Sequence, residues 1–128
     1  MQSKPTLDLT GKRVLVVEDD TVSRIFLREV LLSTNADVNF VRSGYEANKF
    51  MTENSAPHLV FMDVRLPDID GIDLAEEIIR KNPEVKVIVE TAYAIPGIKE
   101  RCEGKGIHGL IYKPINQEQL ISLIQNLV

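Results

Sequence analysis

Polar side chains that could do chemistry recur in this sequence directly after short apolar runs. They are the acids Glu18, Asp19 and Asp20, the single Asp63, Thr91 followed by Ala92, and Lys113 followed by Pro114. Clustered carboxylates repel one another unless a cation neutralises them. Oxygen ligands without thiol or imidazole select a hard cation such as Mg²⁺. A hard cation beside a carboxylate, a hydroxyl and an ammonium suits phosphoryl transfer.

Each of these groups has a role in that chemistry. Asp63 stands alone after the central apolar run, so it is the candidate nucleophile that would form an aspartyl-phosphate. Glu18 and Asp19 are the metal-side pair. The ammonium of Lys113 would neutralise phosphoryl oxygens, and the hydroxyl of Thr91 with a backbone N–H would hold another of them.

Five apolar runs must position these residues. The runs are Val14–Val17, Val38–Val41, Leu59–Met62, Val85–Val89 and Leu110–Tyr112. They are β-branched or aromatic and, the second excepted, nearly continuous, which is typical of buried parallel strands. Helical signals fill the gaps, over Ser23–Leu32, Tyr45–Thr52, Ile72–Lys81, Pro96–Glu103 and Gln117–Val128. Five such units predict a doubly wound α/β sheet, in which ligands bind at the carboxyl ends of the strands.

Composition narrows the class of protein. A length of 128 residues fits one domain. The net charge of −4 lacks the electrostatic footprint of a nucleic-acid binder. The single cysteine, Cys102, allows no intrachain disulfide and fits a reducing, cytoplasmic location. No apolar run approaches the ~18–20 residues of a membrane span. We expect a lead-in over residues 1–10, without a signal peptide, and one domain over 11–128.

Four motifs in this order resemble a known family. They are Val16-Val17-Glu18-Asp19-Asp20, the stretch MDVRLPDIDG over 62–71, Thr91-Ala92 and Lys113-Pro114. Each motif alone is weak, but all four in order at strand ends are highly specific, and they resemble the receiver domain of two-component response regulators. The resemblance covers residues 12–128. It implies a flavodoxin-like sheet of five parallel strands in the order 2-1-3-4-5, with five helices.

The resemblance also implies roles, position by position. Asp63 matches the phosphorylated aspartate, Asp19 a direct Mg²⁺ ligand, and Glu18 a ligand that acts mostly through water. The other implied positions are the backbone carbonyl of Arg65 as a further metal ligand, Thr91 as the hydroxyl that approaches the phosphoryl group, Ala92 as a binding position beside it, and Lys113 as the paired ammonium with a cis bond to Pro114.

Two positions bear on how such a domain would switch and how long its phosphoryl group would last. The family usually has Tyr or Phe where this sequence has Leu110, and Tyr112 lies two residues on, on the same strand face. Whether Tyr112 replaces the usual aromatic stays open. The bulky Arg65 and Tyr93 stand at positions that tune the aspartyl-phosphate lifetime in this family, and they imply slow self-hydrolysis.

Other polar residues have simpler interpretations. Asp20 and Asp70 are expected as helix N-caps, and Asp68 as a solvated loop acid. The stretch 104–109 spells G-x-G-x-x-G, but it follows a helix and opens a strand, which favours a helix end and a turn over a dinucleotide site. His58 and His108 begin strands, at the rim opposite the carboxylates, which makes them poor candidates for catalysis.

The implied function is that of a phospho-acceptor signalling domain rather than an enzyme. A histidine kinase or histidine phosphotransfer protein would donate the phosphoryl group to Asp63 with Mg²⁺ present. Ile25 and Phe26, with Ile115, could dock a partner helix or simply fill the core, and both interpretations stay open. A weak homodimer, a free-standing regulator and the C-terminal receiver of a hybrid sensor kinase also stay open. The rival functions are a small Mg²⁺ phosphatase that uses Asp63 as nucleophile and an interaction domain that needs no phosphorylation.

Overall fold

Five strands alternate with five helices along the chain. The computed structural model describes residues 7–92 and 95–128. The elements in order are β1 (Arg13–Val17), α1 (Thr21–Leu32), β2 (Asp37–Val41), α2 (Gly44–Glu53), β3 (Leu59–Asp63), α3 (Gly71–Lys81), β4 (Lys86–Thr91), α4 (Ile98–Gly104), β5 (Gly109–Tyr112) and α5 (Gln117–Leu127). All ten predicted elements are confirmed, with ends shifted by one or two residues.

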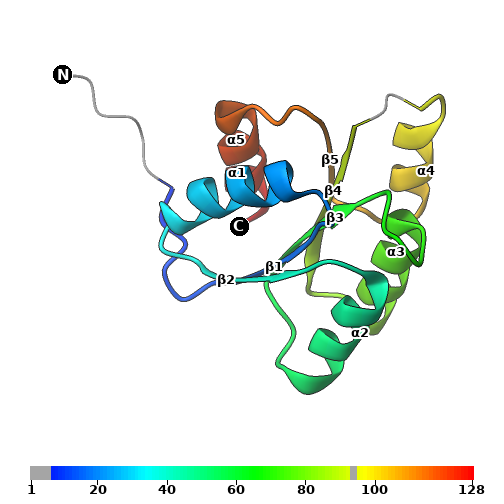
Figure 1. The fold of residues 1–128 in the computed structure, drawn as a ribbon, viewed down its shortest axis with the longest axis horizontal. Helices are drawn as coiled ribbons and strands as arrows, with labels where there is room; N and C mark the ends of the chain where they lie inside the picture. Colours follow the sequence, from blue (N-terminus) through cyan, green and yellow to red (C-terminus); the bar gives the residue numbers. More distant parts are fainter. Residues whose placement is uncertain (1–6, 93–94) are drawn as a thin grey trace.

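The strands form one parallel sheet in the order β2-β1-β3-β4-β5, as the resemblance implied. Figure 1 shows α1 and α5 on one side of the sheet and α2, α3 and α4 on the other. Every residue of the central strand β3 is buried, because helices cover both of its faces. The edge strand β2 is half-buried to exposed, which explains why its apolar run was the least continuous of the five.

Each helix cluster packs on one face of the sheet. One apolar cluster joins inward residues of the sheet to α3 and α4, and the other joins the opposite face to α1 and α5. Leu9 is almost fully buried in the second cluster, and its N–H donates to the Thr34 carbonyl at 2.6 Å. The packed core therefore includes a residue of the segment that the sequence suggested as a lead-in.

Two of the acids cap helices as expected. Asp20 accepts a hydrogen bond from the Ser23 N–H at the start of α1. Asp70 accepts from Ile72 and Asp73 at the start of α3. Both positions confirm the N-cap predictions, and the second fixes the direction in which the chain leaves the loop after β3.

The prediction for Asp68 needs a correction. The residue is exposed, but its two carboxylate oxygens accept from the N–H groups of Gly44 and Tyr45 at 2.8 Å each. Those bonds lower the pKa of Asp68. Asp68 thus ties the loop after β3 to the positive end of α2, a contact across 24 residues of sequence that no local pattern could indicate.

Two histidines lie at the amino ends of strands, as predicted. Nδ1 of His58 accepts from the Arg13 N–H, and Nδ1 of His108 accepts from the Val87 N–H, each at 3.0 Å. These contacts complete the sheet at the rim opposite the acids.

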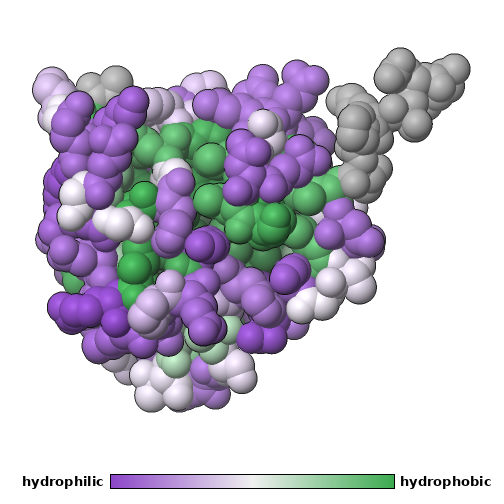
Figure 2. All heavy atoms as spheres, turned by 180° about the vertical axis from the view of Figure 1, so that it is seen from behind, coloured by the Kyte–Doolittle hydropathy of each residue, from purple (hydrophilic) through white to green (hydrophobic). Residues whose placement is uncertain are grey.

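Within the described residues, no helix is both long and apolar enough to cross a bilayer. Figure 2 shows an area of apolar side chains on the reverse face, bordered by polar ones.

Candidate functional site

Strand register places four ionisable residues in one row at the carboxyl edge of the sheet. Val17 pairs with Met62, so Glu18 and Asp63 follow side by side, and Asp63 pairs with Glu90. Glu90 pairs with Ile111, and Lys113 lies two residues beyond on the same face. The row continues the apolar layer that α1 and α5 cover. The side chains of the row therefore lie next to the apolar layer of α1 and α5, at the edge of the sheet.

Lys113 contacts all three acids of this row. Its ammonium lies 2.9 Å from Glu18 Oε1, 3.6 Å from Asp63 Oδ2 and 3.8 Å from Glu90 Oε1. The Lys113 side chain is 14% exposed, whereas those of Glu18 and Glu90 are fully buried. One cation is thus surrounded by three carboxyl groups in a largely dry environment, which strengthens every charge interaction among them.

The carboxyl groups divide into one that stays charged and two that resist ionisation. Burial acts to raise the pKa of Glu18, but its side-chain interactions with Glu90, Asp63 and Lys113 lower it to about 2. Burial first, and then Glu18, raise the pKa of Asp63 to about 7. Burial also raises the pKa of Glu90 well above its usual range. The site therefore holds more carboxyl groups than its single ammonium can neutralise.

Backbone contacts hold Asp63 at the end of β3. Its Oδ1 accepts from the Arg65 N–H at 3.2 Å. Gly71, the first residue of α3, lies so close that a Cβ there would fall 1.8 Å from the Asp63 carbonyl oxygen. Only a residue without a side chain allows α3 to begin against the end of β3, so the Asp70-Gly71 pair both starts the helix and positions the site.

The other predicted site residues surround this row. Asp19 follows Glu18 and is exposed, while the Asp20 N–H donates to Glu18 Oε2 at 2.9 Å. Thr91 ends β4 and is buried, and Ala92 next to it is exposed. The structure thus brings Asp63, Glu18 and Lys113 into direct proximity.

The bond between Lys113 and Pro114 is cis, as the resemblance implied. Leu110, where the family usually has an aromatic residue, is half-buried and packs on the α3–α4 cluster. Tyr112 is 41% exposed. Tyr93, named above for its implied effect on phosphoryl lifetime, lies outside the described residues.

One member of the row was missed by the sequence analysis. Glu90 was passed over because it stands between the apolar run of β4 and Thr91. The available signal was an acidic residue inside an otherwise apolar strand, which is rare without a partner. Strand register was needed to connect Glu90 with Lys113.

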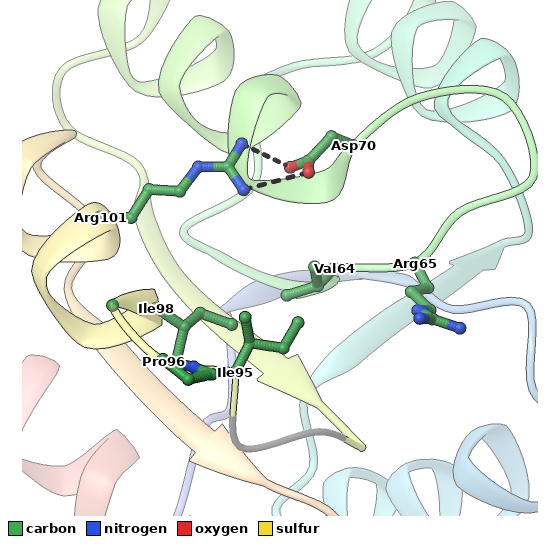
Figure 3. Close-up of a pocket in the computed structure, with 8 residues that line it drawn as sticks. Val64, Arg65, Asp70, Ile95, Pro96, Ile98 and Arg101 are labelled. Carbon is green, nitrogen blue, oxygen red and sulfur yellow. Dashed lines mark hydrogen bonds and ion pairs between the residues drawn. The ribbon is translucent and has the colours of Figure 1, made fainter.

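A cavity of about 220 Å³ opens beside the end of β3, between the loop after β3 and the start of α4. Figure 3 shows Arg101 of α4 reaching Asp70 in a two-pronged ion pair, with Arg65 pointing away from it. Arg101 also lies 3.0 Å from Asp73. These exposed ion pairs fasten α4 to the amino end of α3 on the side of the site opposite α1.

Fold and site together define the class of this protein: a doubly wound α/β domain with a cluster of acidic side chains around a lysine at the carboxyl edge of its sheet. A profile of the response regulator receiver domain matches residues 14–125. The chain belongs to this family. Receiver domains are signalling domains of two-component systems, and phosphorylation and use of a divalent metal are general features of the family.

Relatives include both single-domain and multidomain proteins. The polar-differentiation response regulator DivK of Brucella ovis is 31% identical over 119 residues, which cover 90% of this chain and 94% of DivK. A histidine kinase of Oryza sativa subsp. japonica is 29% identical over 140 residues, covering 94% of this chain but 14% of the kinase.

Solved structures share the fold. A CheY-like receiver domain from Methanospirillum hungatei superposes with a TM-score of 0.82 at 29% identity, covering 90% of this chain and 91% of that one. The receiver domain of a histidine kinase from Syntrophus aciditrophicus gives 0.80 at 28% identity, with 91% and 89% covered.

The chemistry of the donor set fits a hard divalent cation. The groups at the mouth of the site are carboxylate and carbonyl oxygens, and the buried carboxyls exceed the positive charge beside them. Among the described residues, no three His, Cys, Asp or Glu side chains already stand as a ready-made metal cluster.

Proposed function

We propose that Asp63 accepts a phosphoryl group and that Glu18, Asp19, Thr91, Ala92 and Lys113 serve this reaction. The observation that carries the proposal is the 3.6 Å approach of the Lys113 ammonium to the carboxylate of Asp63, at the open edge of the sheet. A largely buried ammonium beside a carboxylate provides both a nucleophile and a counter-charge for phosphoryl oxygens.

Mg²⁺ is the proposed cofactor, held by Asp19, Asp63 and the backbone carbonyl of Arg65, with Glu18 acting through water. When bound, it would neutralise charge on the phosphoryl oxygens and on the acceptor. The raised pKa of Asp63 supports this proposal, because it reflects a carboxyl group that lacks enough positive charge in its surroundings.

The proposed step transfers phosphorus from nitrogen to oxygen. The ionised Asp63 carboxylate forms the new P–O bond while the P–N bond of a phosphohistidine breaks. The electron pair of that bond stays on the imidazole nitrogen, which leaves as a neutral ring if its other nitrogen carries a proton. Lys113 then shifts its interaction from the Asp63 carboxylate to the phosphoryl oxygens, and Thr91 and Ala92 offer a hydroxyl and an N–H to another oxygen.

The proposed donor is a histidine kinase or histidine phosphotransfer protein that docks beside α1. Ile25 is 54% exposed, which supports docking, whereas Phe26 and Ile115 are half-buried against the core. A depression of about 400 Å³ lined by Val22, Phe26 and Ile115 leads to Lys113. An apolar surface next to the acceptor is suited to a helix that presents a phosphohistidine.

The chemistry is tested with a small phosphodonor and Mg²⁺, read by intact mass. Wild type is expected to gain one phosphoryl group, and Asp63→Asn to gain none. Asp37→Asn is the matched control, because Asp37 is exposed at the amino end of β2 and the variant makes the same change of charge. Equal labelling of Asp63→Asn and wild type would refute the assignment.

Docking is tested separately with Ile25→Ser. We expect slower transfer from a phosphorylated kinase and an unchanged rate with the small donor. Leu32→Ser is the matched control, since Leu32 is 56% exposed at the far end of the same helix. Equal slowing by both variants would contradict a docking surface centred on Ile25.

Other finer assignments are proposals of the same kind. Slow self-hydrolysis of the aspartyl-phosphate is proposed from the bulk of Arg65, which is exposed at the mouth of the site. A cytoplasmic location is proposed from the single, buried Cys102. Turnover of a phosphomonoester that is lost in Asp63→Asn would instead favour a phosphatase, and failure to bind Mg²⁺ would favour a phosphorylation-independent interaction domain.

A further inference from the structure

Glu90 is a buried acid that the proposed chemistry does not use. Its side chain shares the face of the sheet that carries Asp63 and Lys113, because Asp63 pairs with Glu90 and Glu90 pairs with Ile111. The neighbours below it in the strand face the apolar layer of α1 and α5. Glu90 therefore lies between Asp63 and the strand that leads to Lys113, and it is fully buried.

Its carboxyl group has few partners. Both oxygens are buried, and within the described chain neither makes a hydrogen bond that meets normal geometry. The cation that pairs with it is Lys113, 3.8 Å away. Glu18 is the other polar neighbour, and its interaction with Glu90 affects the pKa values of both groups. Among the described residues, the charged groups that act on Glu90 are Glu18, Lys113 and Asp63, which all belong to the proposed phosphoryl site.

A role in stability alone does not explain such a residue. Burying a carboxyl group without good hydrogen bonds is unfavourable, and apolar residues of similar volume at such positions often stabilise a protein. Val89 and Ile88, the preceding residues of β4, are apolar and fully buried. An apolar residue at position 90 would continue that pattern, so the acid is better explained by what it does to Lys113.

We propose that Glu90 is a positioning residue, which holds the Lys113 ammonium from the core side so that it faces Glu18 and Asp63. This inference rests on the proposed function of the site. Lys113 follows the end of β5, and its ammonium stands on a flexible four-carbon side chain. Among the described residues, the ammonium is held by the 2.9 Å contact with Glu18 and by the longer contacts with Asp63 and Glu90. The contact with Glu90 keeps the ammonium at the carboxyl edge of the sheet, where an incoming phosphoryl group needs it.

Two substitutions separate positioning from packing. Glu90→Met has similar length but no polar atoms able to hold an ammonium. Glu90→Gln keeps the shape, can accept from Lys113 and can donate to Glu18. Ile111→Met is the matched control, because Ile111 is the fully buried strand neighbour of Glu90 and the change alters packing alone.

The first measurement is the initial rate of Mg²⁺-dependent labelling by a small phosphodonor. We expect Glu90→Met to slow it about tenfold, with Glu90→Gln and Ile111→Met within about threefold of wild type. Thermal unfolding of Glu90→Met should occur at the same temperature as wild type or higher. In a Lys113→Met background, Glu90→Met should have no further effect, because its contribution passes through Lys113.

The second measurement needs no phosphorylation. In protein with ¹⁵N-labelled lysine, the Lys113 ammonium of wild type should exchange its protons with water more slowly than that of Glu90→Met, by about fivefold. Unchanged exchange together with a wild-type labelling rate in Glu90→Met would overturn the role of Glu90. If wild type itself accepts no phosphoryl group, the proposed function fails, and the exchange measurement decides the role of Glu90 by itself.

Discussion

Replacing Asp63 with asparagine should make the protein more stable at neutral and higher pH. The variant keeps an oxygen for the Arg65 N–H and loses the carboxylate charge. Folding raises the pKa of Asp63 from 3.8 to about 7, mainly through burial and secondly through Glu18. The folded state therefore prefers the neutral acid, and ionisation of Asp63 opposes folding.

The pH dependence follows from that preference. Below the unfolded value of 3.8, both states hold the proton and Asp63 has no effect on stability. Between that value and about 7, the folded state binds more protons than the unfolded state, so stability falls as the pH rises. Above about 7 the full penalty applies. Asp63→Asn therefore removes a group that lowers the stability of the fold at high pH and has no effect on it at low pH.

The stability gained by Asp63→Asn can be given first as an upper limit and then with solvent screening included. At 1.36 kcal/mol per pKa unit, the change from 3.8 to about 7 corresponds to about 4 kcal/mol. Water at the open side of the site screens the charge, so we expect roughly half of this, about 2 kcal/mol at pH 8 and less than about 1 kcal/mol at pH 5. Mg²⁺ at pH 8 should stabilise wild type more than the variant, because it offsets the same charge.

Urea unfolding at pH 5 and pH 8 measures both values. Glu18→Gln is the internal comparison with the opposite sign. Burial is outweighed by side-chain interactions that lower the pKa of Glu18 to about 2, so its charge stabilises the fold above pH 4.5, and that stability is lost only as the pH falls toward 2. This variant should be less stable than wild type at both pH values. An Asp63→Asn protein that is less stable than wild type at pH 8 would refute the electrostatic argument.

Three further substitutions test how the site is built. Gly71→Ala should destabilise the fold by more than about 2 kcal/mol in urea unfolding, because its Cβ would collide with the Asp63 carbonyl, whereas Gly104→Ala meets nothing within 4 Å and should be tolerated. Asp68→Ala should lower the thermal midpoint and speed amide exchange at the start of α2, since Gly44 loses its acceptor. Arg65→Ala should release phosphate faster from the labelled protein, and an equal rate would contradict the proposed shielding.

The sequence was informative where chemistry coincides with strand ends. Continuous β-branched runs identified β1, β3, β4 and β5, and in a parallel sheet their carboxyl ends must share one edge. That rule places Asp63 and Lys113 at the same edge of the sheet without any knowledge of their distance. Helix starts at Asp20 and Asp70 were equally predictable, because an N-cap is a local interaction within three residues.

Other features depend on contacts that sequence patterns do not encode. Asp68 caps a helix 24 residues earlier in the chain, and nothing local distinguishes it from a solvated acid. Leu9 enters the core through a contact with Thr34, although the segment around it is polar. Glu90 interacts with Lys113 through the β4–β5 register, and a nearly continuous apolar run such as that of β4 does not indicate that register.

The raised pKa values of Asp63 and Glu90 link the charge of the site to the stability of this domain. The apolar layers on both faces of the sheet stabilise the fold, and the row of carboxyl groups at its edge partly opposes them. Any ligand that brings positive charge to the row, or draws Lys113 toward new oxygens, changes that balance without breaking the core. On the side of the site opposite α1, the start of α3 and α4 are joined by exposed ion pairs such as Arg101 with Asp70. Exposed pairs contribute little stability, so these elements can rearrange at low free-energy cost when the charge of the site changes.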